Sequence, residues 1–341
     1  MAYFRQLDKE IDTLLELLSR DEQWLIVINA DPDALASALA LKRIMTRRVL
    51  DVGIAHVNEV TRPDNLAMIR YLRIPTQKFT TNLAVQYHRL ALVDSQPHHH
   101  KDFEDLSFSL VIDHHPIVEE QPVIVDYKDI QPYGSNSTIM TEYLYNLKIK
   151  PGQLLATALL YGIKTDTCSF ERSFCDEDVR AFRHLTKFAN PDLLRKIVRS
   201  EFHLEWLSYF SLALRRLRLI GRGAFVYVDE VENPDVLVIL ADFLMRVQQI
   251  SWTVVGGTYD DGVVAIFRGD GISRDMGAVA SNLFGELGSA GGHKAMARAE
   301  FPLKQCGKKN PEEFLWKKIS RGKKTDSGLI TTKPHSSFSL P

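Results

Sequence analysis

Acidic and histidine side chains follow apolar segments at four places in this sequence. Asp31 and Asp33 come shortly after the run WLIVI, and Asp94 directly follows LALV. The triplet Asp113-His114-His115 begins as the run SLVI ends, and Asp166 closes the apolar segment YGIKTD. Carboxylate oxygens and imidazole nitrogens are common ligands of divalent metal ions. The recurrence of these residue types after apolar segments therefore indicates a metal site.

Clustered carboxylates need compensation, because like charges a few ångströms apart in a low dielectric repel strongly or become protonated. Divalent cations remove this cost. Aspartate oxygens with a few histidine nitrogens suit Mn²⁺, and Mg²⁺ less well, while the scarcity of cysteine argues against structural zinc. There are more carboxylates than one ion needs, which predicts two Mn²⁺ ions, an arrangement used for phosphoester hydrolysis.

Each of these segments also has a purely structural explanation. A lone aspartate after a strand is more often a turn former or a helix N-cap, which is the favoured interpretation of Asp31 or Asp94 taken alone. Adjacent histidines are more often solvated or hydrogen-bonded than metal-bound. Only the coincidence of four such segments favours the metal site.

The elements that position these residues alternate in type. The segment WLIVINA is typical of a buried strand, ALASALALKRIMTRR is typical of a helix, and the alternation continues through DVGIAHV and RLALVDS. Near-continuous apolar strands separated by helices predict an α/β domain with a mainly parallel sheet. Ligands of such sheets bind beyond the carboxyl ends of the strands, where the acidic segments are expected to meet.

Changes of pattern along the chain predict four parts. Residues 1–190 form the domain that carries the acidic segments, and residues 191–222 form a charged, amphipathic helical connector. Residues 223–318 form a smaller α/β domain. Residues 319–341 are rich in Ser, Thr, Lys and Pro and are expected to be a disordered tail.

The bulk composition narrows the classes of partner. The chain has 341 residues and a net charge of −1, which disfavours a long footprint on duplex nucleic acid. Its three cysteines have neither metal-site nor disulfide-framework spacing, as expected in a reducing compartment. The N-terminal segment does not resemble a signal peptide, and no apolar run has membrane-spanning length. We therefore expect a cytoplasmic protein without a membrane partner; a homodimer is left open.

Taken in order, the segments resemble the DHH phosphoesterase superfamily, which is named for its Asp-His-His triplet. The matching motifs are DPDALAS, VDSQP, VIDHHP and GIKTDT. Further along, FRGDG and DMGAVASNLFGELGSAGGHKAMARAEF resemble the DHH-associated domain. The resemblance covers about residues 20–305. The size and the two-domain layout are similar to the branch of NrnA-like oligoribonucleases and dinucleotide phosphodiesterases.

The resemblance implies roles for the matching positions. Asp113 would orient an imidazole, and His115 would contact the scissile phosphate, which makes these two the implied catalytic residues. Asp94 would bridge the two ions. The implied metal ligands are Asp31, Asp33, Asp94, His114 and Asp166. The implied substrate contacts are Ser37, Asn136, Ser137, Arg268, Gly291, Gly292 and His293.

One position departs from that branch. Many NrnA-like members have a metal-binding histidine where this chain has Val27. The spacing Asn29-x-Asp31-x-Asp33 instead resembles the three spaced acids of the RecJ branch, with asparagine in place of the first acid. Asn29 is therefore included as a candidate ligand. Its neutral oxygen would hold one ion less tightly.

The resemblance and the charge predict hydrolysis of short oligoribonucleotides or linear dinucleotides such as pGpG and pApA. Four alternatives remain open: a RecJ-like single-strand exonuclease, a pAp phosphatase, an inorganic pyrophosphatase or polyphosphatase, and a non-enzymatic dinucleotide sensor. A single-strand exonuclease would need a long basic groove with stacking aromatic residues, and the sequence contains no such stripe.

The run His98-His99-His100 invites a further metal assignment. Neighbours in sequence cannot easily converge on one ion, and Lys101 follows the run. We interpret these residues as an exposed loop without a ligand role.

Overall fold

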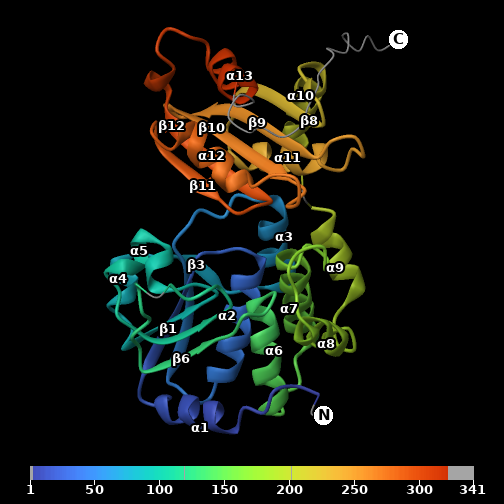
Figure 1. The fold of residues 1–341 in the computed structure, drawn as a ribbon. Coiled ribbons are helices and arrows are strands. Elements are labelled where there is room, and N and C mark those ends of the chain that lie inside the picture. The colour runs from blue at the N-terminus through green and yellow to red at the C-terminus, as the bar shows by residue number, and fades with distance from the viewer. Residues whose placement is uncertain (1–2, 119, 201, 322–341) are drawn as a thin grey trace. The chain divides into compact units, whose positions relative to one another are not determined.

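The computed structural model describes residues 3–118, 120–200 and 202–321 (Figure 1). The chain divides into two compact units, Met1–Phe202 and His203–Pro341, and each is described by itself. Each unit contains one six-stranded sheet flanked by helices. The predicted α/β class is confirmed.

The sheet of the first unit is parallel throughout and has the strand order β3-β2-β1-β4-β5-β6. The order reverses between β1 and β4, the point where open α/β sheets bind their ligands. Two of the acidic segments follow these two strands. The strands are β1 (Gln23–Ile28), β2 (Asp51–His56), β3 (Thr76–Lys78), β4 (Arg89–Val93), β5 (Phe108–Asp113) and β6 (Tyr127–Ile130).

Longer helices cover one face of this sheet, and short ones contact the other. The short elements are α4 (Thr81–Ala84), the 3₁₀ helix η1 (Pro97–His99) and α5 (Lys101–Glu104). The longer ones are α1 (Asp8–Leu17), α2 (Pro32–Met45), α3 (Pro63–Leu72), α6 (Asn136–Asn146), α7 (Gln153–Asp166), α8 (Asp176–Leu185) and α9 (Pro191–Val198).

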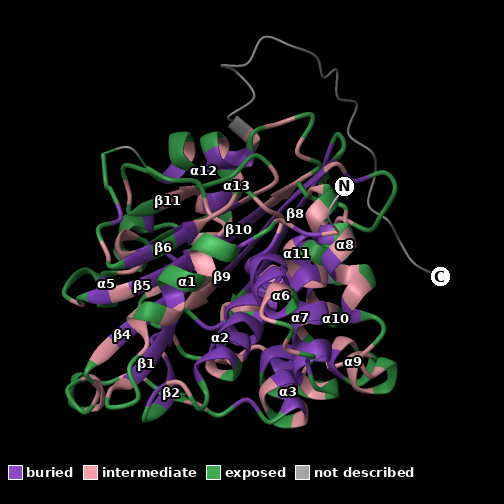
Figure 2. Ribbon diagram, turned by 90° about the horizontal axis from the view of Figure 1, so that it is seen from below, coloured by how far each residue is buried: buried purple, intermediate pink, exposed green. Residues whose placement is uncertain are grey.

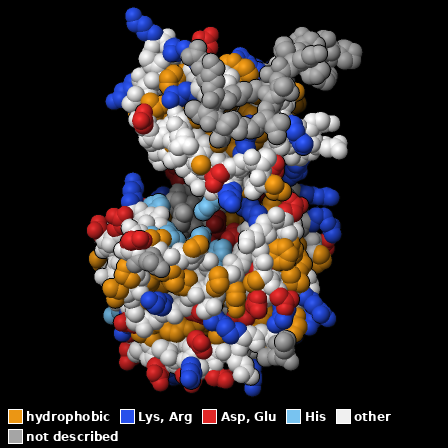
Figure 3. All heavy atoms as spheres, viewed as in Figure 1, with side chains coloured by type: hydrophobic (Ala, Val, Ile, Leu, Met, Phe, Trp, Pro, Cys, Tyr) orange, Lys and Arg blue, Asp and Glu red, His pale blue; other side chains and the backbone are white. Residues whose placement is uncertain are grey.

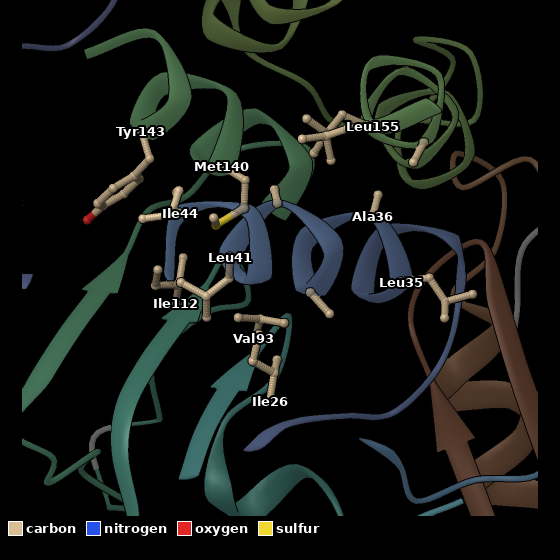
Figure 4. Close-up of a cluster of buried hydrophobic side chains, with 14 of the residues drawn as sticks. Ile26, Leu35, Ala36, Leu41, Ile44, Val93, Ile112, Met140, Tyr143 and Leu155 are labelled. Atoms are coloured by element: carbon tan, nitrogen blue, oxygen red, sulfur yellow. The ribbon is translucent and has the colours of Figure 1, made fainter. Parts of the chain in front are cut away.

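Helix α2 is buried along most of its length (Figure 2). In Figure 4 it lies between the sheet, represented by Ile26 and Val93, and the helices α6 and α7, represented by Met140 and Leu155. Its alanine-rich sequence favours helix and lets neighbouring helices approach closely. The helix is therefore fixed from both sides, and so are the polar residues in its first turns.

The sheet of the second unit is mixed, with the order β11-β12-β10-β9-β8-β7, and β8 and β9 are its parallel pair. Its strands are β7 (Arg218–Ile220), β8 (Gly223–Glu230), β9 (Trp252–Tyr259), β10 (Gly262–Gly269), β11 (Ser289–Gly292) and β12 (Met296–Pro302). One face packs on α10 (Leu207–Arg215) and α11 (Asp235–Leu244). The other packs on α12 (Met276–Phe284) and α13 (Pro311–Arg321). Two short 3₁₀ helices, η2 (Leu204–Trp206) and η3 (Leu303–Cys306), complete this unit.

The segment predicted as a connector, residues 191–222, is divided between the units. Ile197 of α9 packs in the core of the first unit, and Ala213 of α10 packs in a core of the second. Helix α13 continues to Arg321, past the predicted start of the tail at residue 319, because Ile319 is buried in the core. The rest of the predicted tail lies outside the described residues. Within the described ranges, no helix has the length and apolar character needed to cross a membrane.

Candidate metal centre

Two aspartates at the start of α2 have different environments. Asp31 is the N-cap, and its Oδ1 accepts a hydrogen bond of 2.8 Å from the backbone N–H of Ala34. Asp33 is fully buried. Its two oxygens accept backbone hydrogen bonds from the first turn of α6, at 2.6 Å from Asn136 and 2.8 Å from Ser137. Asp33 is therefore held in one orientation by the N-terminus of a second helix.

Asp94 follows β4 in an uncommon backbone conformation. Its φ is +60°, in the left-handed region, which aspartate tolerates better than most residues. The turn is held by a 2.9 Å hydrogen bond from the Asp94 N–H to the carbonyl of Ile112 on β5. The residue is 6% exposed, so the turn directs a carboxylate into the protein rather than toward solvent. Such strain is commonly found at functional sites.

His114 follows β5 and has a defined tautomer. Its Nδ1 lies 3.0 Å from the backbone carbonyl of Tyr133, which can only accept, so Nδ1 carries a proton. Nε2 lies 3.3 Å from Asp94 Oδ1 and 3.2 Å from Asp166 Oδ2, at the end of α7. A histidine held through Nδ1–H with Nε2 facing carboxylates has the arrangement typical of metal-binding histidines.

The cluster formed by Asp33, Asp94, His114 and Asp166 is the candidate metal centre. Each residue offers one nitrogen or oxygen, and these atoms all lie within 4.8 Å of one another. A second group shares two of these residues and adds His115. Figure 3 shows histidine side chains at the surface of the N-terminal unit, with acidic side chains nearby. The structure thus brings together segments that are up to 133 residues apart in the chain, from Asp33 to Asp166.

Two predicted ligands lie outside these groups. Asp31 is an exposed residue by its overall accessibility, although its capping carboxylate is enclosed enough for burial to raise its pKa. Its charge also raises the pKa values of Asp94 and Asp166, so it lies near them. Asn29 is exposed directly after β1. Their roles as ligands stay predictions.

Without a counter-charge, ionisation of this cluster is unfavourable. Burial, and then the charge of Asp166, raises the pKa of Asp33 to about 7. Burial, and then the charges of Asp33 and Asp31, raises the pKa of Asp94 well above its usual range. Burial would lower the pKa of His114, but Asp166 and Asp94 outweigh it and raise that pKa. A cation would remove the repulsion that raises the aspartate pKa values.

Two buried polar atoms at the centre support the binding of a cation there. Asp94 Oδ1 and His114 Nε2 have no hydrogen-bond partner within the described part of the chain, although they lie close together. Buried polar atoms are almost always satisfied, by protein, water or an ion. The donor set of aspartate oxygens with one histidine nitrogen suits Mn²⁺ or Mg²⁺. The residues present therefore fit a divalent cation.

Asp113 and His115 form a pair beside the centre. Asp113 is fully buried, and its Oδ1 lies 2.8 Å from His115 Nδ1. Its Oδ2 accepts a hydrogen bond of 2.8 Å from the side chain of Gln96. Burial opposes ionisation of Asp113, but the bonds from His115 and Gln96 lower its pKa below its ordinary value. The charged Asp113 therefore holds the proton on His115 Nδ1, and Nε2 of this half-exposed ring remains available.

His99 lies in this region, although its sequence context predicts no ligand role. His98 and His99 belong to the 3₁₀ helix η1 and not to the predicted loop, and His99 is exposed. However, its ring centroid lies 5.2 Å from that of His115, and ring nitrogens of both residues lie within 4.8 Å of Asp113. The sequence carried no signal for this contact, because it depends on the turn between β4 and η1.

Three predicted substrate contacts lie beneath the centre. Ser37, Asn136 and Ser137 are fully buried. The backbone N–H groups of Asn136 and Ser137 already bind Asp33, while the Oγ atoms of Ser37 and Ser137 and the side-chain amide of Asn136 lack partners among the described residues. The structure therefore places Asn136 and Ser137 against Asp33, and Ser37 is buried on the same helix as Asp33.

Asp178 of α8 supports the same region and was missed. It is fully buried and accepts hydrogen bonds from the N–H of Gly134 at 2.8 Å and from the hydroxyl of Thr138 at 2.6 Å. These bonds fix the loop that leads into α6, and so the N–H groups that hold Asp33. In the sequence, Asp178 is one acid among several in DEDVR and cannot be distinguished.

The remaining predicted substrate contacts belong to the second unit. Arg268 at the end of β10 forms a 2.6 Å ion pair with Asp242. Gly291 and Gly292 end β11, and Gly292 has a φ of +147°, a conformation that requires glycine. His293 follows them and is exposed. Their roles in binding stay predictions.

The fold and the site define an α/β protein with a candidate divalent-metal centre at the switch point of its parallel sheet. Residues 23–163 match the DHH family, N-terminal domain. This part of the chain is therefore similar to the N-terminal domain of the DHH family. The matched range contains all the cluster residues except Asp166.

Individual curated proteins are also similar to this chain. An uncharacterized protein of Methanocaldococcus jannaschii is 33% identical over 278 residues, covering 81% of this chain and 57% of the relative. A probable manganese-dependent inorganic pyrophosphatase of Listeria monocytogenes is 23% identical over 168 residues, covering 48% of this chain and 54% of the relative. The chain thus spans about half the length of the curated relatives it matches.

A solved structure matches the fold over most of the chain. It is an exopolyphosphatase-related protein from Bacteroides fragilis, with a TM-score of 0.73 and 14% sequence identity. The match covers 91% of this chain and 93% of that one. At this identity the likeness concerns the fold alone.

Proposed function

We propose that this protein is a Mn²⁺-dependent phosphoesterase that hydrolyses short oligoribonucleotides or linear dinucleotides to mononucleotides. The observation that carries the proposal is the convergence of Asp33, Asp94, His114 and Asp166 within 4.8 Å, with His115 at the edge of the cluster. Acids brought together at such a cost, with raised pKa values, are typical of functional sites rather than of structural ones.

The cluster residues would hold the metal. Asp94 and His114 belong to both of two overlapping groups of possible ligands, so they would contribute to holding a second ion if two were bound. Bound Mn²⁺ would lower the pKa of water and offset the charge of a phosphate group, the two requirements of phosphoester hydrolysis. Mg²⁺ would serve less well, because it demands a stricter octahedral set of oxygens.

Hydrogen bonds within the protein hold the proposed metal ligands and His115 in fixed orientations. The backbone of α6 fixes Asp33, and the carbonyl of Tyr133 fixes His114, so the ligands need little rearrangement. Asp113 accepts from Nδ1 and so fixes the orientation of His115, whose Nε2 would donate a hydrogen bond to a phosphate oxygen when it too carries a proton. Preorganised groups of this kind stabilise developing charge without a reorganisation cost.

The proposed substrate class rests on charge. A chain with a net charge of −1 has little overall attraction for a polyanion, and a short nucleotide carries few phosphates. A long duplex is therefore not expected as a substrate. We propose that Arg268, Gly291, Gly292 and His293 contribute to binding the part of the substrate away from the reacting phosphate.

Hydrolysis of inorganic pyrophosphate is the second candidate. The observation in its favour is that several relatives are named probable manganese-dependent inorganic pyrophosphatases. These matches cover 48% of this chain. Pyrophosphate and a dinucleotide both place a phosphorus–oxygen bond at the centre, so the cluster alone does not discriminate between them.

A substrate panel tests both candidates. The purified chain, with Mn²⁺ and in parallel with Mg²⁺, is incubated with pGpG, pApA, cyclic dinucleotides, pAp, pyrophosphate and a strand of about twenty nucleotides. We expect Mn²⁺-dependent release of mononucleotides from the dinucleotides, abolished in Asp94→Asn and retained in Asp102→Asn, whose exposed carboxylate lies on α5.

Other outcomes select other functions. Phosphate release from pyrophosphate alone favours the pyrophosphatase, and preference for the longer strand favours the exonuclease. Tight dinucleotide binding without turnover at saturating Mn²⁺ favours the sensor. Equal activity of the Asp94→Asn variant and the unmodified chain would rule out this cluster as the active site.

A further inference from the structure

His99 and His115 form a second feature at the edge of the metal centre. They belong to different segments, η1 and the turn after β5, and their rings meet edge to face at 5.2 Å. His99 is exposed and the side chain of His115 is 43% exposed, so both can reach a ligand in solvent. The proposed hydrolysis uses only His115.

The hydrogen bonds of His99 fix its tautomer. The backbone N–H of Gln96 points at His99 Nδ1 from 3.1 Å, and a backbone N–H can only donate. The hydroxyl of Ser95 lies 3.3 Å from the same nitrogen. Nδ1 of His99 must therefore accept, and the single proton of the neutral ring lies on Nε2, on the opposite side of the ring from the backbone.

This tautomer excludes one role and favours another. A protonated Nε2 cannot bind a metal ion without losing its proton, so His99 is not a metal ligand through this atom. It is instead a hydrogen-bond donor. His115 has its proton on Nδ1, which faces Asp113, so its Nε2 would donate to a phosphate oxygen only when it carries a second proton. Of the two rings, His99 thus offers an N–H donor already in its neutral form.

We propose that His99 is a substrate-binding residue whose Nε2–H donates a hydrogen bond to a phosphate oxygen of the substrate held beside His115. This inference rests on the proposed phosphoesterase function and adds a contact from η1. The chemical class it recognises is a phosphate group, and it adds no ligand to the metal centre.

Four variants distinguish the role of His99 as a hydrogen-bond donor to the substrate from its structural role in the capping box of η1. His99 occupies the third position of a capping box, where both Glu and Gln can accept the Gln96 N–H. His99→Gln keeps an acceptor and returns an N–H donor, whereas His99→Glu keeps the acceptor and removes the donor. His99→Ala removes both. His100→Glu places the same negative charge at the neighbouring residue and serves as the control.

We expect kcat/KM for pGpG with Mn²⁺ to fall about 10- to 100-fold in His99→Ala and His99→Glu. It should stay within about threefold of the unmodified value in His99→Gln and His100→Glu. Binding of inorganic phosphate to the Mn²⁺-loaded protein, measured by calorimetry, should weaken in the same order. Mn²⁺ binding by His99→Ala and His99→Gln should be unchanged, because no metal ligand is altered.

The outcomes separate this inference from the proposed function. If the unmodified chain hydrolyses no substrate of the panel, the proposed function fails, and the phosphate-binding series still decides the role of His99. If the chain is active and His99→Glu matches His99→Gln in both measurements, the donor role is wrong. Equal losses in His99→Glu and His100→Glu would show a general charge effect and would also overturn the inference.

Discussion

At the scale of single residues, the centre consists of ordinary acids made unusual by their surroundings. Asp33 and Asp94 are buried side by side with Asp166, and burial raises the pKa of each. Burying these mutually repelling carboxylates lowers the stability of the metal-free protein. Functional sites often lower stability in this way, because they need charged groups in a low dielectric. Two predictions follow from this electrostatic cost.

The first prediction concerns Asp94→Asn. Loss of one buried carboxylate should leave the metal-free protein as stable as before, or more stable by about 1 kcal/mol, because a repulsive charge is removed. The same variant should lose the rise in melting temperature that Mn²⁺ produces in the unmodified chain. Thermal melts with EDTA and with Mn²⁺ test both parts. A strongly destabilised variant would instead indicate a structural role for Asp94.

The second prediction concerns pH. The pKa of Asp33 is raised from 3.8 to about 7, so the folded chain retains a proton that the unfolded chain has lost across this interval. A native state that binds more protons loses stability as pH rises. The raised pKa of His114 acts in the same direction above its ordinary value of 6.5.

We therefore expect the melting temperature of the metal-free protein to fall between about pH 5 and about pH 8. The increase produced by Mn²⁺ should grow over the same interval, because the metal competes with protons for its ligands. The Asp94→Asn variant provides the control and should show a shallower fall. A metal-free protein that becomes more stable over this interval would contradict the raised pKa values of the cluster.

At the scale of single residues, the candidate metal-ligating residues could be predicted from the sequence, but the contacts between side chains could not. The residues Asp33, Asp94, His114 and Asp166 could be proposed because strand ends in a parallel sheet converge. The contacts of His99, and the burial of Ser137 under Asp33, depend on the exact path of a turn and on how closely two helices approach. No local pattern in one sequence encodes these distances.

At the scale of elements, three helices converge on Asp33. It belongs to α2, it is held by the first turn of α6, and Gly162 of α7 lies against it. A Cβ built on Gly162 would lie 2.4 Å from Ser137 Oγ and 2.8 Å from Asp33 Oδ1. The absence of a side chain at Gly162 is therefore what lets α7 approach the centre.

The third prediction compares two glycines of the same helical region. Gly162→Ala should destabilise the protein by about 1–3 kcal/mol through overpacking, and should weaken Mn²⁺ binding by displacing Asp33. Gly152→Ala, at the N-cap of α7 with no atom within 4 Å of its Cβ, should destabilise by less than about 1 kcal/mol, because alanine is a poorer N-cap than glycine, and should leave Mn²⁺ binding unchanged. Urea unfolding and calorimetric titration with Mn²⁺ measure these effects. Equal behaviour of the two variants would contradict the close packing around Asp33.

The order of elements was predictable because the periodicity of apolar residues changes with element type. The boundaries of the elements were harder to predict. Helix α13 extends beyond residue 318 because Ile319 packs in the core, and the composition of the surrounding sequence does not indicate this packing. The strand order, with its reversal between β1 and β4, required the structure, since consecutive strands of a parallel sheet can be placed on either side.

At the scale of the whole molecule, the chain consists of two units with separate cores, and the candidate metal centre belongs to the first. The second unit offers exposed polar residues, among them His293, on the loop after β11. His293 was proposed above as a substrate contact, and it can be altered without changing any residue of the cluster.

The fourth prediction tests this contact. His293→Ala should raise KM for pGpG by about tenfold with little change in the affinity for Mn²⁺, because the residue belongs to the unit without the cluster. Steady-state kinetics at saturating Mn²⁺ measure the change, and His203→Ala, at the start of the second unit, provides a histidine control. A KM unaffected by His293→Ala would remove this residue from the substrate site.

The central claim is that Asp33, Asp94, His114 and Asp166 bind Mn²⁺. It is tested most directly by the anomalous scattering of manganese in crystals of the Mn²⁺-loaded protein. We predict two anomalous peaks among these four side chains, with Asp94 contacting both. Crystals at saturating Mn²⁺ with no peak at this cluster would contradict the account.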